Sequence, residues 1–148
     1  MENRIGVKIT AGNRKVLSVT LNDILSLLKI RSNLKWAILD IYAIGDLGEN
    51  KSMLAFEEEV GNSENGIIFG WNDLMALSSK LEQIMEIVLI GNEDVSALKR
   101  YLSNKEMYNK CKCTIELIDS SYWLIHSTED KLIKYLKEKL PGGEYVNE

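Results

Sequence analysis

One short segment of the chain brings together the residue types of a hydrolytic triad. Asp119, Ser120 and Ser121 stand within seven residues of His126, the only histidine. A nucleophilic serine needs its histidine base at about 3 Å. The serines belong to an expected turn, however, and His126 lies about five residues along the outgoing strand, roughly 17 Å away at 3.3 Å per residue. The spacing therefore indicates turn residues and a strand-end histidine, and we assign no catalytic residue.

Three consecutive carboxylates, Glu57, Glu58 and Glu59, have the chemistry for acid or base catalysis. On a helix their side chains fan through about 200°, so at most two can approach one site. No apolar wall that would raise a carboxyl pKa is evident beside them. A solvated helix face or a docking surface for a basic partner explains these residues better than general acid or base catalysis.

The loop that resembles a phosphate site lacks the residues that bind phosphate. Residues 45–48, Gly-Asp-Leu-Gly, follow an expected strand and come shortly before a helix. No Gly-x-x-x-x-Gly-Lys-Ser/Thr motif is present, and Asp46 and Glu49 would repel phosphate. We therefore expect no nucleotide and no other cofactor.

The two cysteines, Cys111 and Cys113, are separated by one residue. In a strand both would point to one face, where neighbouring cysteines rarely reach disulfide geometry. A zinc site needs about four ligands, which this region does not supply. We expect two buried thiols and no metal.

Trp71 is the aromatic residue best placed to bind a partner. It lies between Gly70 and Asn72, at the end of a short expected strand that acidic segments flank. An aromatic anchor surrounded by charges is typical of a protein–protein hot spot. Simple packing of the indole against the core is the alternative.

Hydrophobic periodicity predicts strands that alternate with helices along most of the chain. Apolar runs at 36–44 and 84–90 indicate central strands covered on both faces. The other strands are expected at 4–11, 16–19, 67–71, 112–118 and 122–126, with helices at 20–31, 52–60, 72–81, 92–102 and 128–140. The prediction is an α/β (α+β) fold with a central mixed sheet of five to seven strands and about five helices. Residues 1–148 form a single domain, in which 141–148 are a frayed tail.

Each expected helix follows a residue that can cap its N-terminus. These caps are Thr20 (with Asp23 as its capping-box partner), Ser52, Asn72, Asn92 and Thr128. Gly12-Asn13 predicts a turn, and residues 119–121 predict a hairpin loop. On the helix at 52–60, Met53, Leu54 and Phe56 are expected to face inward and the three glutamates outward.

Charge is distributed unevenly along the chain. Residues 40–94 contain twelve carboxylates and two bases, whereas residues 1–39 contain seven bases and two acids. The net charge of −4 therefore conceals a strongly acidic middle. Such a block repels nucleic acid and attracts basic surfaces. The lysines of the last helix alternate with acids, so we expect no direct binding of nucleic acid.

The apolar runs are strand-sized, far below the roughly 20 residues of a membrane-spanning helix. Residues 1–4, Met-Glu-Asn-Arg, show neither the apolar region nor the cleavage site of a signal peptide. These features predict a cytoplasmic protein that does not contact a membrane.

The chain resembles the immunity proteins of bacterial toxin–immunity systems, including those of contact-dependent inhibition and other polymorphic toxins. The resemblance rests on the acidic middle and on residues 119–126, Asp-Ser-Ser-Tyr-Trp-Leu-Ile-His, followed by an amphipathic helix. It implies tight binding to a cognate toxin domain, commonly a nuclease. In such a complex the carboxylates of the immunity protein block the cationic cleft of the toxin. The candidate partner-binding residues are Asp46, Glu49, Glu57, Glu58, Glu59, Glu64, Trp71 and Asp73.

Two other functions fit the same sequence. One is a generic cytoplasmic protein–protein interaction module, which can form a homodimer through an apolar sheet edge. The other is a small enzyme with an unrecognised site. A pocket containing two or more of Asp40, Asp119, Ser121 and His126 would favour the enzyme.

Overall fold

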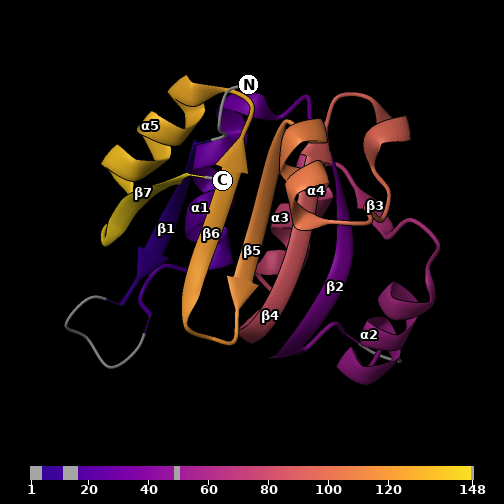
Figure 1. Ribbon diagram of the computed structural model, residues 1–148. Coiled ribbons are helices and arrows are strands. Elements are labelled where there is room, and N and C mark those ends of the chain that lie inside the picture. The colour runs from indigo at the N-terminus through magenta and orange to yellow at the C-terminus, as the bar shows by residue number, and fades with distance from the viewer. Residues whose placement is uncertain (1–4, 12–16, 49–50, 148) are drawn as a thin grey trace.

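The computed structural model describes residues 5–11, 17–48 and 51–147, which fold into one seven-stranded sheet with five α-helices (Figure 1). The strands are β1 (Ile5–Thr10), β2 (Lys35–Gly45), β3 (Ile67–Phe69), β4 (Leu81–Asn92), β5 (Cys113–Ile118), β6 (Tyr122–Ser127) and β7 (Gly143–Asn147). The helices are α1 (Leu21–Leu27), α2 (Met53–Asn62), α3 (Trp71–Ser78), α4 (Asn104–Lys110) and α5 (Asp130–Lys139), with 3-10 turns η1 (Leu28–Arg31) and η2 (Val95–Ala97). The predicted fold class and the predicted numbers of strands and helices are confirmed.

The strands lie in the order β3-β2-β4-β5-β6-β1-β7, and each of the six neighbouring pairs is antiparallel. The alternation of strands and helices predicts a mixed sheet because a helix usually connects parallel neighbours. Among the described residues every pair is antiparallel, so the prediction of a mixed sheet is wrong. Two of the helical crossovers skip a strand. Helix α3 links β3 to β4 around β2, and α5 links β6 to β7 around β1. The linked strands are therefore parallel, but another strand separates them.

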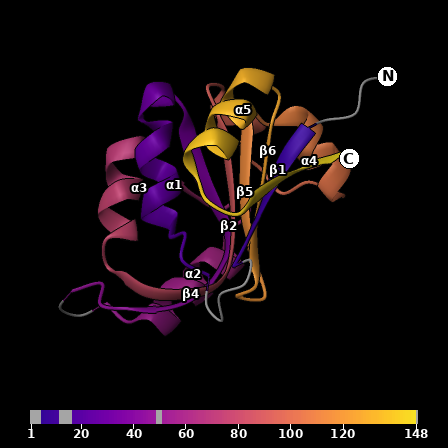
Figure 2. The same cartoon turned by 90° about the vertical axis from the view of Figure 1, so that its left-hand side faces the viewer.

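The helices divide unequally between the two faces of the sheet (Figure 2). The back face carries α1, α3 and α5, which contribute Ile24, Leu74 and Leu136 to the larger apolar cluster. The front face carries α4, whose Met107 and Tyr108 belong to a smaller cluster. One short helix cannot span the whole sheet, so part of the front face lies open in Figure 1.

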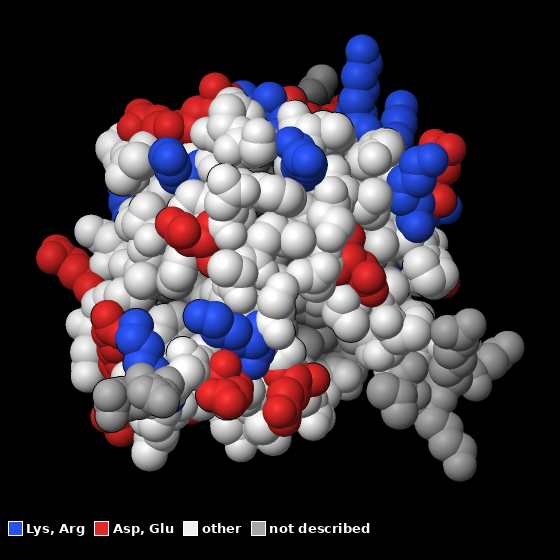
Figure 3. Space-filling view, turned by 180° about the vertical axis from the view of Figure 1, so that it is seen from behind, with Lys and Arg blue, Asp and Glu red and all other residues white. Residues whose placement is uncertain are grey.

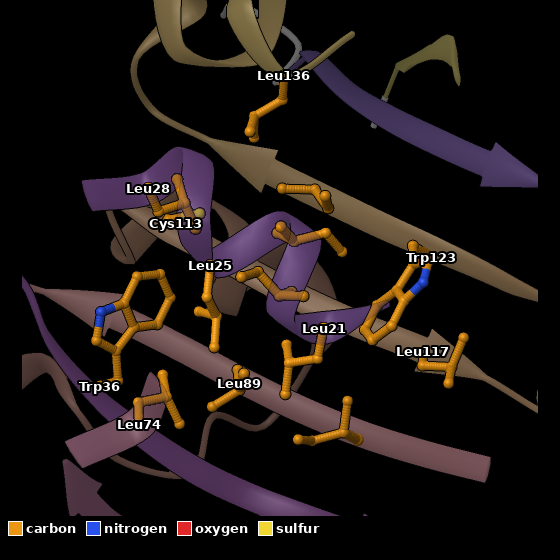
Figure 4. Packing of buried hydrophobic residues seen from close by; sticks show 14 of the residues in the cluster. Leu21, Leu25, Leu28, Trp36, Leu74, Leu89, Cys113, Leu117, Trp123 and Leu136 are labelled. Carbon is orange, nitrogen blue, oxygen red and sulfur yellow. The ribbon is translucent and has the colours of Figure 1, made fainter. Parts of the chain in front are cut away.

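Two tryptophans anchor the back core, as their apolar strands predict. Trp36 and Trp123 lie at opposite ends of the cluster, with Leu21 and Leu25 of α1 between them (Figure 4). The Trp123 Nε1 donates a hydrogen bond to the carbonyl oxygen of Val19 at 2.8 Å. Buried aromatic side chains of this size typically contribute about 3–5 kcal/mol when compared with alanine. The back core is therefore the principal source of stability.

Local capping signals are correct for two helices and displaced for two others. Thr20 and Asp23 form the predicted capping box at α1, and the Ser52 hydroxyl accepts from the Ala55 N–H at α2. Helix α3 begins after Gly70 without a side-chain cap, so the prediction that Asn72 caps it is wrong. Helix α5 is preceded by Glu129, one residue beyond the predicted Thr128.

The helix predicted at 92–102 is wrong. This segment forms η2 and an extended connection, and the next helix, α4, begins after Ser103. Asp94 accepts from the Ser96 N–H, which closes a tight turn in place of a helix. Leu102, an apolar residue of this predicted helix, is fully exposed. The Ser103-x-x-Glu106 spacing is a capping-box pattern that marks the true start of the helix.

The tail predicted to be frayed at 141–148 forms an edge strand over most of its length. Strand β7 pairs with β1, with Tyr145 opposite Val7. Gly142 adopts a left-handed φ of 79° and accepts a hydrogen bond from the Thr10 N–H, which turns the chain back onto the sheet. Pro141-Gly142-Gly143 therefore ends a helix and begins a strand.

Three smaller predictions concern turns and thiols. Residues 17–19 form no strand, and the predicted Gly12-Asn13 turn lies outside the described residues. Cys111 and Cys113 are both free and buried, as predicted. Cys111 packs into the front cluster and Cys113 into the back cluster. The prediction that both point to one face is therefore wrong, because Cys111 precedes β5.

Candidate functional site

Helices α2 and α3, with Phe69 of β3, line a surface groove of about 370 Å³. Its apolar lining includes Phe56 and Leu77 as well as Phe69. Its charged lining consists of Lys51, Glu59, Asp73 and Lys80. An aromatic lining beside charged groups matches the anatomy of protein-binding sites, where an apolar centre lies inside a polar rim.

The helical spacing of both flanking elements places a charged and an apolar side chain together. Phe56 and Glu59 are three residues apart on α2, and Asp73 and Leu77 are four apart on α3. Residues with these spacings share one side of a helix. Gly66 positions β3 between the helices, because a Cβ there would lie 2.7 Å from the Ile38 carbonyl oxygen and φ is +84°.

The groove belongs to the most acidic part of the molecule. Residues 46–80 contain seven acids and two bases. Their described part forms α2, β3 and α3, at the β3 end of the sheet. We call residues 46–80 the acidic edge. Among the described residues, the structure thus gathers six of the twelve central carboxylates in one region of the fold.

The remaining central acids are distributed elsewhere. Glu93 forms ion pairs with Arg31 at 3.3 Å and with Lys112 at 3.9 Å. Asp40 and Glu86 are exposed on β2 and β4. Acidic and basic side chains are interspersed on the face seen from behind (Figure 3). The negative charge therefore has one main concentration and does not cover a whole side of the molecule.

Seven of the eight candidate binding residues fall within the described ranges. Glu59 and Asp73 meet at the groove, whereas Glu58 and Glu64 are exposed outside its lining. Asp46 is exposed, and its carboxylate accepts the Gly48 N–H at 2.9 Å. Glu49 lies outside the described residues.

Glu57 turns toward the sheet, so the prediction that it points outward is wrong. Its carboxylate accepts the backbone N–H of Ala43 at 3.0 Å. Strand β3 pairs with β2 only at Trp36, Ala37 and Ile38, so α2 rather than a strand lies beside β2 at Ala43. Leu54, predicted to face inward, is 66% exposed. Glu57 is therefore a structural acid that attaches α2 to β2.

Trp71 is fixed by packing against a neighbouring helix. Its Nε1 donates a hydrogen bond to the Leu25 carbonyl oxygen of α1 at 3.0 Å, and its side chain is half-buried. It is not among the residues that line the groove. These contacts favour the packing alternative over an exposed anchor.

Replacing the indole should therefore lower stability. We expect Trp71→Phe to reduce the free energy of unfolding by about 1 kcal/mol, because the Leu25 carbonyl loses its donor. Urea denaturation measures this loss, and Tyr145→Phe, at a half-exposed position on β7, is the control. Equal stability of the two variants would show that the indole hydrogen bond contributes nothing.

The residues of the imagined hydrolytic triad remain apart. His126 is fully buried on β6, whereas Asp119 and Ser121 lie exposed in the β5–β6 hairpin. A second groove, of about 270 Å³ on the front face, contains Asp40 and Arg100. Neither groove contains two of the four residues that would favour an enzyme.

A buried polar cluster lies beneath α4. The His126 ring stacks on Tyr108 with centroids 3.8 Å apart, and the Tyr108 hydroxyl donates to Glu116 at 2.6 Å. Neither ring nitrogen of His126 has a hydrogen-bond partner among the described residues. Burial lowers the pKa of His126 from 6.5 to about 4. The imidazole is therefore neutral at pH 7 and enclosed by protein.

Sequence patterns identified two of the charged residues of the groove, Glu59 and Asp73, but not its apolar lining. Phe56 and Leu77 carry only the general signal of an inward helical stripe, and Phe69 that of a strand. Their meeting depends on the position of β3 at the sheet edge.

Among the described residues, no cluster of three or more His, Cys, Asp or Glu side chains could hold a metal ion. None of the described helices is long and apolar enough to cross a membrane. No protein-family model, curated protein or solved structure matches the chain.

Proposed function

We propose that this protein binds and neutralises a basic toxin domain, of the nuclease kind, as an immunity protein does. The observation that carries the proposal is the groove of the acidic edge, where Glu59 and Asp73 stand beside Phe56, Phe69 and Leu77. The partner would place a basic and apolar segment across this groove. No reaction is assigned to the protein itself.

Electrostatics supports a basic partner. Residues 46–80 carry a formal charge of −5, from seven acids and two bases. A nuclease lines its substrate cleft with Lys and Arg to hold phosphates. Clustered carboxylates oppose that charge and can raise association rates to about 10⁸–10⁹ M⁻¹s⁻¹ at low salt. The charge then steers the encounter, and the aromatic lining stabilises the complex.

The two bases of the groove restrict which surface can dock. Lys51 and Lys80 line it together with Glu59 and Asp73. A partner covered uniformly with positive charge would meet these two ammonium groups as well as the carboxylates. The arrangement fits a partner that presents an acidic side chain among its basic ones, so that this acid meets the lysines of the groove. Matching of the two charge patterns would then give specificity.

The proposed location is the cytoplasm, where a nuclease toxin would find nucleic acid. Cys111 and Cys113 are free and buried. Burial raises the pKa of the Cys111 thiol to about 11 and also raises that of Cys113. These protonated thiols are unreactive, and it is the absence of a disulfide between them that suits a reducing compartment.

Filling the groove should prevent neutralisation. Ala76 is exposed and lines the groove, so Ala76→Arg adds bulk and positive charge without disturbing the core. We expect its affinity for the product of the adjacent open reading frame to fall at least about tenfold, or 1.4 kcal/mol. Growth rescue on co-expression and co-purification of the two proteins measure the effect.

Asn33→Arg is the matched control, because it adds the same side chain at an exposed turn outside the groove. It should rescue growth as the wild type does. Rescue by both variants would remove the groove from the interface. Absence of rescue and of co-purification with the wild type would contradict the proposed function.

A further inference from the structure

Part of the front face of the sheet is uncovered. Figure 1 shows α4 over the upper part of the sheet, while the lower parts of β2, β4, β5 and β6 lie open. On β2, Tyr42 is 57% and Ile44 is 51% exposed. Solvated faces of antiparallel sheets usually present polar side chains. Strand β2 is predicted to be covered on both faces. Both of its faces are buried only in its first half.

Strand register identifies the other side chains of this uncovered area. Asp40 lies opposite Val88, and Tyr42 lies opposite Glu86. Along the row of Asp40 and Val88 the sheet continues through Glu116, which is buried beneath α4, and then through Leu124 and Lys8. Residues that face each other across antiparallel strands share one face. We call the front-facing residues Asp40, Tyr42, Ile44, Glu86 and Val88 the open strip.

The segment beside the open strip has the complementary character. Residues 99–110 contain four bases, Lys99, Arg100, Lys105 and Lys110, and one acid, Glu106. This segment also carries Leu102, whose side chain is fully exposed. Arg100 is bonded to carbonyl oxygens of its own chain, so α4 itself offers Lys105 and Lys110. The same face of one molecule thus presents a helix with two lysines and an open apolar strip with two carboxylates.

We propose that the open strip is covered by helix α4 of a second copy of this chain in a two-fold symmetric dimer. A two-fold axis crossing the strands near Asp40 would bring the α4 of each copy over the lower half of the other sheet. Such an interface is isologous, so it needs one surface that is complementary to itself. Leu102 and Lys105 then meet Tyr42 and Glu86 of the other copy.

The size of the surface sets the strength of this dimer. The four open strands at about 4.8 Å and four residues at about 3.3 Å give an open area of roughly 19 by 13 Å. Two such areas and the two helices that cover them would bury roughly 1,000 Å² in total, which is the size of weak, transient interfaces. The dimer is therefore expected to dissociate in the micromolar range. It does not depend on the proposed toxin binding, because the groove of the acidic edge is lined by different residues.

Sedimentation equilibrium of the full chain between about 1 and 500 µM tests the proposal. The wild type should shift from monomer to dimer over this range. Leu102→Glu, at a fully exposed position, should raise the dissociation constant at least about tenfold. Lys131→Glu, exposed on α5, is the control and should dimerise as the wild type does.

Charge exchange tests the docking geometry. Lys105→Glu and Glu86→Lys, both at exposed positions, should each weaken self-association. In either variant, residue 105 of each copy meets a residue 86 of the same charge in the other copy, at both symmetric contacts. A mixture of the two variants should recover a dimer that contains one of each. A wild type that remains monomeric at 500 µM would overturn the proposal. A dimer that is not weakened by Leu102→Glu, Lys105→Glu or Glu86→Lys would also overturn the proposal.

Discussion

Lowering the pH from 7 to 4.5 is expected to cost the protein about 2 kcal/mol of stability through His126 alone. Burial holds the pKa of this imidazole at about 4 in the folded state. In the unfolded chain the pKa returns to about 6.5. The unfolded state therefore binds a proton first as the pH falls, and stability is lost between about pH 6.5 and 4.

His126→Phe isolates this contribution. A phenyl ring can keep the stacking on Tyr108 and carries no nitrogen to protonate. It also removes two buried nitrogens that lack hydrogen-bond partners, so its stability at pH 7 should equal or exceed that of the wild type.

Urea denaturation of both proteins at pH 7 and 4.5 gives the comparison. Carboxylates such as Asp94, whose pKa hydrogen bonds to Ser96 lower, titrate in both proteins and cancel in the difference. Equal pH dependence in the wild type and His126→Phe would show that the buried imidazole does not control acid stability.

Arg100→Met should destabilise the protein by about 3 kcal/mol. Its guanidinium donates to the carbonyl oxygens of Leu39 at 2.7 Å, Val60 at 2.8 Å and Ser63 at 3.2 Å. Each hydrogen bond from a charged donor contributes about 1.5–3 kcal/mol, and bonds that share one side chain are not additive. Arg100 therefore joins β2, the end of α2 and the segment before α4.

Lysine at the same position separates charge from geometry. Arg100→Lys keeps the charge but cannot reach three divergent carbonyls from one ammonium group, so it should restore less than half of the loss. The control is Lys99→Met, because Lys99 is exposed and its ammonium group lies 5.5 Å from the centre of the Tyr101 ring. Chemical denaturation in urea measures all three variants. Equal stability of Arg100→Met and Lys99→Met would contradict the role assigned to Arg100.

Arg100 also links stability to the candidate site. By bonding the Val60 carbonyl it satisfies the C-terminal end of α2, the helix that carries Phe56 and Glu59. Glu57 holds the same helix through the N–H of Ala43. Two polar attachments thus fix one wall of the groove to β2. The acidic edge is therefore a fixed surface of the fold, already arranged before a partner binds.

Features determined by neighbouring residues could be predicted from the sequence. The capping box of Thr20 and Asp23 and the hairpin at 119–121 need only a few adjacent residues, and both are present. In the hairpin, Asp119 and Ser120 adopt left-handed φ angles of 51° and 58°, conformations that a short turn requires. Such signals act within one turn of the chain and do not depend on the rest of the fold.

Features determined by distant pairing could not be predicted. Strand β7 forms because residues 143–147 find the free edge of β1, nearly the whole chain length away. Glu57 faces inward because α2 lies beside β2 at Ala43, beyond the short pairing of β2 with β3. The apolar residues at 95–102 have helical spacing, but this segment is not an α-helix. Its Arg100 donates hydrogen bonds to carbonyl oxygens of α2 and β2. In each case a tertiary contact outweighs a local pattern.

The candidate site shows the same division. Composition identifies the acidic middle, and helical spacing places Glu59 beside Phe56. Asp73 and Leu77 lie near Glu59 and Phe56 because β3 lies at the sheet edge between the two helices. Glu93 pairs with Arg31, some sixty residues away, which no local pattern reveals. Charge counts therefore locate the acidic edge, but only the fold separates its free acids from those used internally.

The association rate with the product of the adjacent open reading frame, measured by stopped flow as the salt concentration rises from about 50 to 500 mM, tests docking at the acidic edge most directly. Steering by clustered charge should make the rate fall at least about tenfold over this range. The double variant Glu59→Gln/Asp73→Asn should associate more slowly than the wild type at 50 mM and respond less to salt. A wild-type rate that ignores salt, or a double variant that associates like the wild type, would contradict it.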